Sequence, residues 1–379
     1  MQIEFNASDG PSLGVEVELE LIDLRTGQLA SVATPVLTEL GVGHPDGVHP
    51  KAKHELFECC IEIVTGVCTT VAEARADLEA TLAEVRAAAA RHGCTVICSG
   101  SHPFSLWGEQ RVSPNERYDR LVDEMQWMAR RLQIFGVHVH VGVRSGEKAI
   151  VVANAVANRI PHLLALTASS PFWEGHDTGL ASTRSKVFEG LPTAGLPADL
   201  ADWADFEQYM STLVAAGAIS TVREVWWDVR PHPDFGTVEL RMCDGIPTMG
   251  EVASVAALAQ ALVAHIDRRH DEGAAPARQR DWILCENKWR AARHGLDAEL
   301  IVDDGGRVQP ARDAILQLVA DVRPDAERLG CADELDGITA ICEHGASYER
   351  QRRASEGGTN LWAVVDQLAR ELSSGEPSR

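Results

Sequence analysis

The sequence lacks the signatures of several common classes of protein. None of its nine cysteines form a C-x-x-C pair, and their odd number and scattered positions argue against a zinc ribbon and a disulfide framework. We therefore expect reduced, mostly buried thiols. The sequence also has no G-x-G-x-x-G turn and no P-loop, which argues against a dinucleotide-binding fold and a P-loop nucleotide site.

Positive charge is scarce relative to negative charge. The 379 residues include 35 lysines and arginines against 56 aspartates and glutamates, a net charge of -21. Such a chain is repelled by nucleic-acid backbones and anionic membrane surfaces, so neither is an expected partner. ATP is not excluded, because bound cations can hold its phosphates. The sequence shows no secretory signal and no apolar run that we expect to span a bilayer, which favours a cytoplasmic protein.

What the sequence does contain is an ordinary globular composition with distinct helical and extended segments. Hydrophobic residues make up 45% and charged residues 24%. Capping boxes and apolar spacing predict helices over residues 71–92, 115–135, 147–168, 249–270, 278–294, 310–322 and 361–372. Alternating or β-branched runs predict strands over residues 12–23, 95–99, 135–143 and 237–242. Without a βαβ rhythm, this mixture predicts an α+β fold with an antiparallel sheet.

The first predicted strand carries an unusual set of acids. Glu16, Glu18 and Glu20 alternate with aliphatic residues, so all three carboxylates share one face of the strand. Like charges on one face repel unless water solvates them or a cation neutralises them. A wet edge strand is the simplest explanation of this segment taken alone.

The same separation of polar and apolar faces recurs in three other segments. They present Glu58 and Glu62, His138 and His140, and Glu239 and Arg241. If these strands lie side by side, they form a concave surface lined with oxygen ligands and one nitrogen, and such ligands suit Mg²⁺ or Mn²⁺. We take His138 as the nitrogen ligand and His140 as a structural histidine. Glu55 joins this face only if the backbone is helical or bulged before Glu62.

Three arginines are candidates for binding anionic groups. Arg184 lies in a long Gly/Pro-rich stretch, Arg230 precedes the last predicted strand, and Arg241 shares a strand face with Glu239. A guanidinium group binds phosphate or carboxylate in bidentate fashion. Each arginine taken singly is more typical of a surface or ion-pair residue than of a binding residue. Arg241 is the strongest candidate because of the carboxylate beside it.

Several of these segments resemble a known family. The stretches "GVEVELELIDLRTG", "HELFECCIEIVTGVC", "GVHVHVGV" and "WWDVRPHPDFGTVELRMCDG" are similar to the carboxylate–amine ligases of the glutamate–cysteine ligase type 2 family. The resemblance implies a glutamine-synthetase-like catalytic fold, in which a curved antiparallel sheet with flanking helices binds ATP and divalent metal on its concave face. It implies a catalytic domain over residues 1–270, with residues 271–379 as a helical part packed on the same domain.

The resemblance also implies roles for individual residues. The metal ligands it implies are Glu16, Glu18, Glu55, Glu62, His138 and Glu239. It implies catalytic roles for Glu239 and Arg241, and phosphate or substrate binding by Arg184, Arg230 and Arg241. The family motif G-x-E-E-E has Val17 as its middle residue here. That position faces the core by strand alternation, so we expect no loss of a ligand, although the substrate can differ.

The implied reaction is ATP-dependent amide formation through an acyl phosphate. Glutamate supplies the carboxylate and cysteine the amine in the family pattern, and such members can show weak glutamate–cysteine ligase activity. ATP, Mg²⁺ or Mn²⁺, small amino acid or amine substrates and a homodimer are the implied partners. A cover must keep water from the acyl phosphate, and residues 174–204 are the predicted part of it. Two alternatives are a phosphotransferase of the same fold and a nucleotide- or metal-binding module without catalysis.

Overall fold

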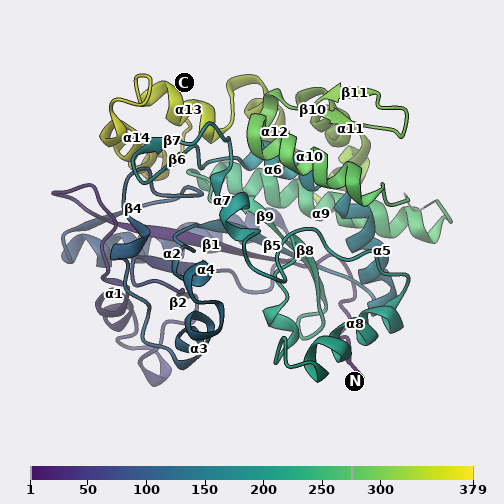
Figure 1. Cartoon of the computed structure of the whole chain (residues 1–379), viewed down its shortest axis with the longest axis horizontal. Coiled ribbons are helices and arrows are strands. Elements are labelled where there is room, and N and C mark those ends of the chain that lie inside the picture. The colour runs from purple at the N-terminus through teal and green to yellow at the C-terminus, as the bar shows by residue number, and fades with distance from the viewer. Residues whose placement is uncertain (1, 275–276, 379) are drawn as a thin grey trace.

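A seven-stranded sheet with flanking helices forms the centre of the computed structural model, which describes residues 2–274 and 277–378 (Figure 1). The strand order is β2-β3-β1-β5-β9-β8, β4 also pairs with β1, and every pairing is antiparallel. The strands are β1 (Leu13–Asp23), β2 (Ala52–His54), β3 (Cys60–Val64), β4 (Cys94–Ile97), β5 (Gly136–Gly142), β8 (Val229–His232) and β9 (Thr237–Asp244). The predicted antiparallel α+β fold is confirmed.

Two small hairpins lie outside this sheet. They are formed by β6 (Phe172–Trp173) with β7 (His176–Asp177), and by β10 (Glu299–Ile301) with β11 (Val308–Pro310). Short 3₁₀ turns span η1 (Pro45–Gly47), η2 (Trp107–Glu109), η3 (Val222–Glu224) and η4 (Gly295–Asp297).

The two helices with predicted capping residues form as expected. They are α2 (Val71–Arg91), which begins after Thr70, and α9 (Met249–Asp271), which begins after Thr248. Each threonine side chain accepts a hydrogen bond from the backbone N–H three residues later, which satisfies one of the free donors at a helix start. The other helices of the sheet region are α1 (Ala33–Leu40), α7 (Thr183–Phe188) and α8 (Trp203–Ala215).

Two predicted helices are each broken into two. The 115–135 segment forms α3 (Glu116–Met125) and α4 (Trp127–Arg130), separated by Gln126 at a φ of 48°. The 147–168 segment forms α5 (Gly146–Ala157) and α6 (Ile160–Thr167), which are bent by 61°. Pro161 sits in the first turn of α6, where its missing N–H is harmless but where it prevents α5 from continuing. Apolar composition alone does not reveal such breaks.

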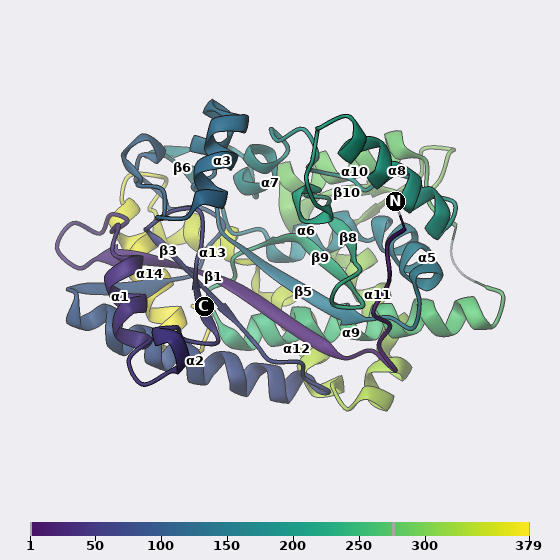
Figure 2. The same ribbon diagram turned by 90° about the horizontal axis from the view of Figure 1, so that it is seen from below.

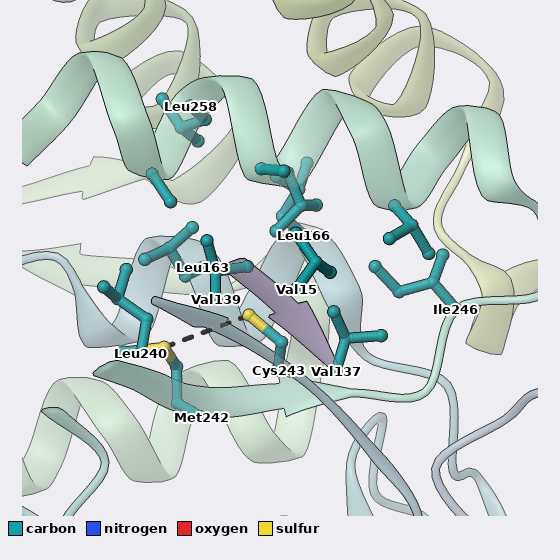
Figure 3. Packing of buried hydrophobic residues seen from close by; sticks show 14 of the residues in the cluster. Val15, Val137, Val139, Leu163, Leu166, Leu240, Met242, Cys243, Ile246 and Leu258 are labelled. Atoms are coloured by element: carbon teal, nitrogen blue, oxygen red, sulfur yellow. Dashed lines mark hydrogen bonds between the residues drawn. The ribbon is translucent and has the colours of Figure 1, made fainter. Parts of the chain in front are cut away.

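The aliphatic face of the sheet packs against helices. Figure 2 shows α2 and α9 running along one face of the sheet. Figure 3 shows Val15, Val139 and Leu240 directed from three neighbouring strands toward Leu258 of α9, with Leu163 of α6 beside them. All five side chains are buried. Period-two alternation therefore turns the aliphatic side chains into the core and leaves the polar side chains on the opposite face.

Helix α9 is the most apolar long helix of the described residues. Its mean hydropathy of 1.4 over an 18-residue window is high enough for a membrane span, in contrast to our expectation from the sequence. However, 83% of that window is buried inside the protein. A helix that is hydrophobic all round is also what the centre of a large core requires, and α9 lies between the sheet and the C-terminal helices.

The C-terminal part is helical and packs on the same core. Its helices are α10 (Asp281–His294), α11 (Ala311–Leu329), α12 (Ala332–His344), α13 (Ser347–Ala354) and α14 (Leu361–Ser374). Helices α11 and α12 pack against α9, and one hydrophobic cluster contains residues of both parts. The division between residues 270 and 271 stays a prediction, and residues 275 and 276, shortly after it, lie outside the described residues.

Candidate active site

The strand pairing brings the predicted acids and histidines together. Glu16 on β1 is opposite His138 on β5, and Glu18 is opposite Glu62 on β3. On the other side of β5, His140 is opposite Glu239 on β9. Because these four strands are neighbours and their side chains alternate, the polar residues form one continuous face of the sheet.

This polar face is the floor of a large cavity of about 860 Å³. Helix α3, residues 217–226 and part of α7 form its walls. All of the predicted site residues line the cavity: Glu16, Glu18, Glu55, Glu62, His138, Arg184, Arg230, Glu239 and Arg241.

The acids and imidazoles form three overlapping groups that could each hold a cation. The ligand atoms of each group lie within 4.8 Å of one another. The groups are Glu16 with Glu62 and His138, Glu16 with His140 and Glu239, and Glu18 with Glu55 and Glu62. We call these residues the acidic basin: Glu16, Glu18, Glu55, Glu62, His138, His140 and Glu239. Shared members join the three groups into one surface.

Two acids on one side of the basin have raised pKa values. Burial and the neighbouring Glu55 raise the pKa of Glu18 to about 8, although the Gly136 N–H donates to its Oε2 at 2.5 Å. Burial and the charges of Glu16 and Glu55 raise the pKa of Glu62 well above its usual value. These carboxyl groups are therefore crowded in a way that a bound cation would relieve.

The other side of the basin is already partly compensated. Burial acts to raise the pKa of Glu16, but its interactions with the imidazoles of His138 and His140 outweigh burial and lower the pKa. The Nδ1 atom of His138 lies 3.1 Å from Glu16 Oε2. Burial likewise acts to raise the pKa of Glu239, and the charges of Arg230 and Arg241 hold it well below its usual value. The basin thus has one compensated side and one crowded side.

Arg230 and Arg241 are held in place by Glu239. Arg230 donates to Glu239 Oε2 from Nε at 2.9 Å and from Nη2 at 2.6 Å, and Arg241 forms an ion pair with the other oxygen. The Nη1 of Arg230 donates to the carbonyls of Val225 and Arg223 at 3.0 and 3.1 Å. Arg230 is therefore saturated by protein partners, whereas Arg241 keeps donors for a ligand in the cavity.

The family model of glutamate–cysteine ligase family 2 matches residues 12–371. The chain belongs to glutamate–cysteine ligase family 2. Its relatives include the "Putative glutamate--cysteine ligase 2-1" of Frankia alni, 54% identical over all of this chain and 99% of that protein. Another is the "Putative glutamate--cysteine ligase 2" of Thermobifida fusca, 50% identical over all of this chain and 95% of that protein. The predicted family is confirmed.

Solved structures of distant relatives share the fold. A crystal structure of the glutamate–cysteine ligase of Francisella tularensis in complex with AMP has a TM-score of 0.71 at 14% identity. The match covers 97% of this chain and 90% of that chain. A bifunctional glutathione synthetase from Pasteurella multocida has a TM-score of 0.65, over 95% of this chain and 52% of that chain, also at 14% identity. At 14% sequence identity, these two matches show that the family 2 chain shares the fold of the solved structures.

The acidic basin of this family 2 chain includes one residue, His140, that the sequence did not predict as a ligand. We interpreted His140 as a structural histidine, but its Nε2 lies 3.5 Å from Glu16 Oε1 and 3.7 Å from Glu239 Oε1. That buried nitrogen has no hydrogen-bond partner among the described residues, while Nδ1 contacts the Thr237 hydroxyl at 3.1 Å. The signal was available, since His140 shares a strand face with His138.

Two acids of the predicted polar face lie outside the cavity. Glu20 is fully buried, accepts a hydrogen bond from the Ser99 hydroxyl at 2.6 Å, and has its pKa raised to about 8 by burial. Glu58 accepts hydrogen bonds from the backbone N–H and hydroxyl of Thr34 at 3.1 and 2.6 Å. For Glu20, strand alternation identifies the face of the residue but not how far along the strand the cavity reaches. Glu58 lies in the turn before β3, so the predicted strand face that it shares with Glu62 is wrong.

The predicted cover over residues 174–204 forms one part of the cavity wall. Its residues that line the cavity are Arg184, Phe188 and Leu191. Arg184 and Phe188 belong to α7, which packs against α10. Helix α3, which contributes Arg117 and Tyr118, and residues 217–226 border the cavity as well. A covering role for residues 174–204 stays a prediction.

Proposed function

We propose that the chain uses ATP to join the side-chain carboxylate of glutamate to an amine, with cysteine as the amine of the family pattern. The observation that supports it is one cavity in which an acidic basin for cations adjoins Arg184 and Arg241. Membership of glutamate–cysteine ligase family 2 supports the same reaction class. The expected cytoplasmic location and homodimer stay predictions.

The donor set fits Mg²⁺ or Mn²⁺. These cations prefer carboxylate oxygens, and Mn²⁺ accepts imidazole nitrogen as well. This assignment is supported by the raised pKa values of Glu18 and Glu62 and by the Nε2 of His140, which has no hydrogen bond among the described residues. The acidic basin would hold the cation, which when bound neutralises negative charge on the phosphate oxygens of ATP.

The residues of the chain position the reactants. The glutamate carboxylate attacks the γ-phosphorus, the bond to the bridging oxygen breaks, and ADP leaves. The amine then attacks the acyl carbon, inorganic phosphate leaves, and the amine nitrogen loses its proton. Arg241, oriented by Glu239, donates to the transferring phosphoryl group, and Arg184 binds a negatively charged group of a substrate. The cavity walls limit the access of water to the acyl phosphate.

The experiment that tests this proposal is a screen for phosphate release. Purified protein is given ATP and Mg²⁺ with pairs of amino acids and amines, and the products are analysed by mass spectrometry. The proposal expects phosphate release that requires both substrates, together with a new amide. A phosphorylated substrate without an amide would indicate a phosphotransferase, and binding of ATP without any turnover would indicate a binding module.

Glu62→Gln should weaken the binding of Mn²⁺ by at least about 10- to 100-fold, because it removes a charged oxygen from two groups of the basin. Isothermal titration with Mn²⁺ measures the change. Glu58→Gln is the matched control, since Glu58 belongs to the same region but contacts Thr34 outside the cavity. Equal affinity in the two variants would contradict the assignment of the basin.

Gly136→Ala should lower kcat/KM by up to about 10²-fold, because a Cβ at this position would lie 2.2 Å from Arg184 Nη2 and force the guanidinium to move. Steady-state kinetics of phosphate release measures it. In the control Gly14→Ala, the added Cβ has His140 Cβ at an ordinary 3.6 Å, so its kinetics should stay near those of the unmodified protein. A Gly136→Ala enzyme with unchanged kinetics would exclude a role for the Arg184 position.

A further inference from the structure

Arg184 differs from the two arginines beside Glu239. Its side chain is 3% exposed and lines the cavity, yet it forms no ion pair with a carboxylate of the described residues. Its two terminal nitrogens both donate to the Arg241 carbonyl at 3.3 Å, and its Nε has no partner there. The charge of Arg184 acts against the effect of burial on the pKa values of Glu18 and Asp244, although neither carboxylate forms an ion pair with it. The helix that carries Arg184 determines where its side chain enters the cavity.

That helix, α7, is tied at its start to a fully buried carboxylate. Asp244 ends β9 and is 0% exposed. Its Oδ1 accepts the Ser182 hydroxyl at 2.8 Å, and its Oδ2 accepts the Ser170 hydroxyl at 2.6 Å and the Ser169 N–H at 2.9 Å. Asp244 thus satisfies two serine hydroxyls from two separate segments.

Both of those hydroxyls in turn hold the backbone of α7. The Ser182 hydroxyl accepts from the Ser185 N–H at 3.2 Å as the N-cap of the helix. The Ser170 hydroxyl accepts from the backbone N–H of Arg184 itself at 3.0 Å. Each serine can orient its lone pairs toward α7 because its proton goes to Asp244. One carboxylate therefore fixes the direction of both hydrogen bonds.

The other end of α7 is also anchored by buried charge. Glu189 follows the helix and pairs with Lys288 of α10 at 2.8 Å. Lys288 pairs in addition with Asp228 at 2.5 Å, and the Asp228 carbonyl accepts from the Arg241 N–H at 2.8 Å. The six-residue helix is thus connected at both ends to β9, the strand that carries both Glu239 and Arg241.

We infer that Asp244 is a positioning residue, which holds Arg184 at the cavity through Ser170 and Ser182 so that the guanidinium receives the negatively charged group of the substrate. This inference rests on the proposed function for the identity of the ligand. The hydrogen-bonded chain from Asp244 to Arg184 rests on the contacts alone. Asp244 itself does not line the cavity.

A double-mutant cycle tests the inference. Arg184→Ala should lower kcat/KM by about 10²–10³-fold. Asp244→Asn should lower it by about 10- to 100-fold, because its amide offers N–H where Ser170 and Ser169 need an acceptor. If Asp244 acts through Arg184, adding Asp244→Asn to Arg184→Ala should change kcat/KM by no more than about twofold. An undiminished effect of Asp244→Asn in that background would overturn the inference.

Asp325→Asn is the matched control. Asp325 is also fully buried, accepts from His265 at 2.9 Å and from Arg268 at 3.0 Å, and lies away from the cavity. The effect of Asp325→Asn on kcat/KM should be small, and it should be the same in the unmodified protein and in the Arg184→Ala variant. If Asp325→Asn reproduced the Asp244→Asn pattern, general loss of stability would explain both, and the inference would fail.

A crystal structure of the Asp244→Asn variant gives a readout that needs no activity. The Arg184 guanidinium should leave the Arg241 carbonyl in that variant and stay in place in Asp325→Asn. Ser182→Ala provides a milder second variant, which removes only the N-cap and should move α7 in the same direction. An unmoved Arg184 would overturn the inference, whereas an inactive wild-type enzyme with a displaced Arg184 would count only against the proposed function.

Discussion

Replacing Glu239 by glutamine is expected to lower kcat by about 10²–10³-fold while the sheet stays folded. Glu239 is 1% exposed and lies at the point where the acidic basin meets the arginines. It pairs with Arg230 and Arg241 and belongs to the group with Glu16 and His140. Glutamine keeps the shape but removes the charge, so both the cation ligand and the orientation of Arg241 are weakened together.

The measurement is phosphate release at saturating substrates, with circular dichroism to confirm the fold. Glu251→Gln is the control, because Glu251 is a buried carboxylate that pairs with an arginine outside the cavity, Arg350, at 2.9 Å. Both variants remove a buried charge, and only Glu239→Gln should lose turnover per folded molecule. Wild-type turnover by Glu239→Gln would refute the role of the basin in catalysis.

The largest effect on stability is expected from Arg350→Met. Arg350 links α13 to Glu251 of α9 and to Glu371 of α14 at 2.9 and 3.1 Å, and all three side chains are buried. Methionine leaves two carboxylates in the interior without a counterion. Breaking a buried ion pair in this way costs about 3–5 kcal/mol of unfolding free energy. We therefore expect C-terminal helices that separate more easily from α9.

The stability that Arg350→Met loses should depend on pH in a definite direction. Burial raises the pKa of Glu251 although Arg350 opposes the rise, so removal of Arg350 should raise it further. A carboxyl group with a raised pKa in the folded state is most favourable when protonated, and its contribution to stability falls as the pH rises. Arg350→Met should therefore lose more stability at pH 8 than at pH 5.

Urea unfolding followed by circular dichroism measures this change. Arg370→Met is the matched control, since the ion pair of Arg370 with Asp366 has side chains 66% and 63% exposed. An exposed pair of this kind contributes at most about 1 kcal/mol. Equal loss in both variants would show that the buried network does not stabilise the fold. Turnover per folded molecule should be unchanged in Arg350→Met, because Arg350 does not line the cavity.

The polar face of the sheet could be predicted because its cause is local. Alternation within β1 sends Val15 to the core and Glu16 to the cavity, whatever strand lies beside it. The starts of α2 and α9 are local for the same reason, since Thr70 and Thr248 each cap their own helix. Patterns of this kind, joined to the family resemblance, were enough to select the predicted site residues that meet in one cavity.

Other features required the distant partners to be known. Glu18 and Glu20 have the same local pattern, yet Glu18 lies in the cavity opposite Glu62 of β3, whereas Glu20 is enclosed beside Ser99. The approach of His140 to Glu239 could not be predicted either, because it depends on the pairing of β5 with β9. The break at Gln126, which turns α3 into a wall of the cavity, has no counterpart in the apolar spacing of that segment.

The sequence by itself determined which side chains face away from the core, which helices begin at capped threonines, and which family the chain resembles. Only the tertiary structure decided where along each strand the basin ends, that His140 joins it, and that Asp244 reaches Arg184 through two serines. The reason is physical: side-chain direction follows from backbone geometry over a few residues, whereas a site depends on the register between strands far apart in the chain.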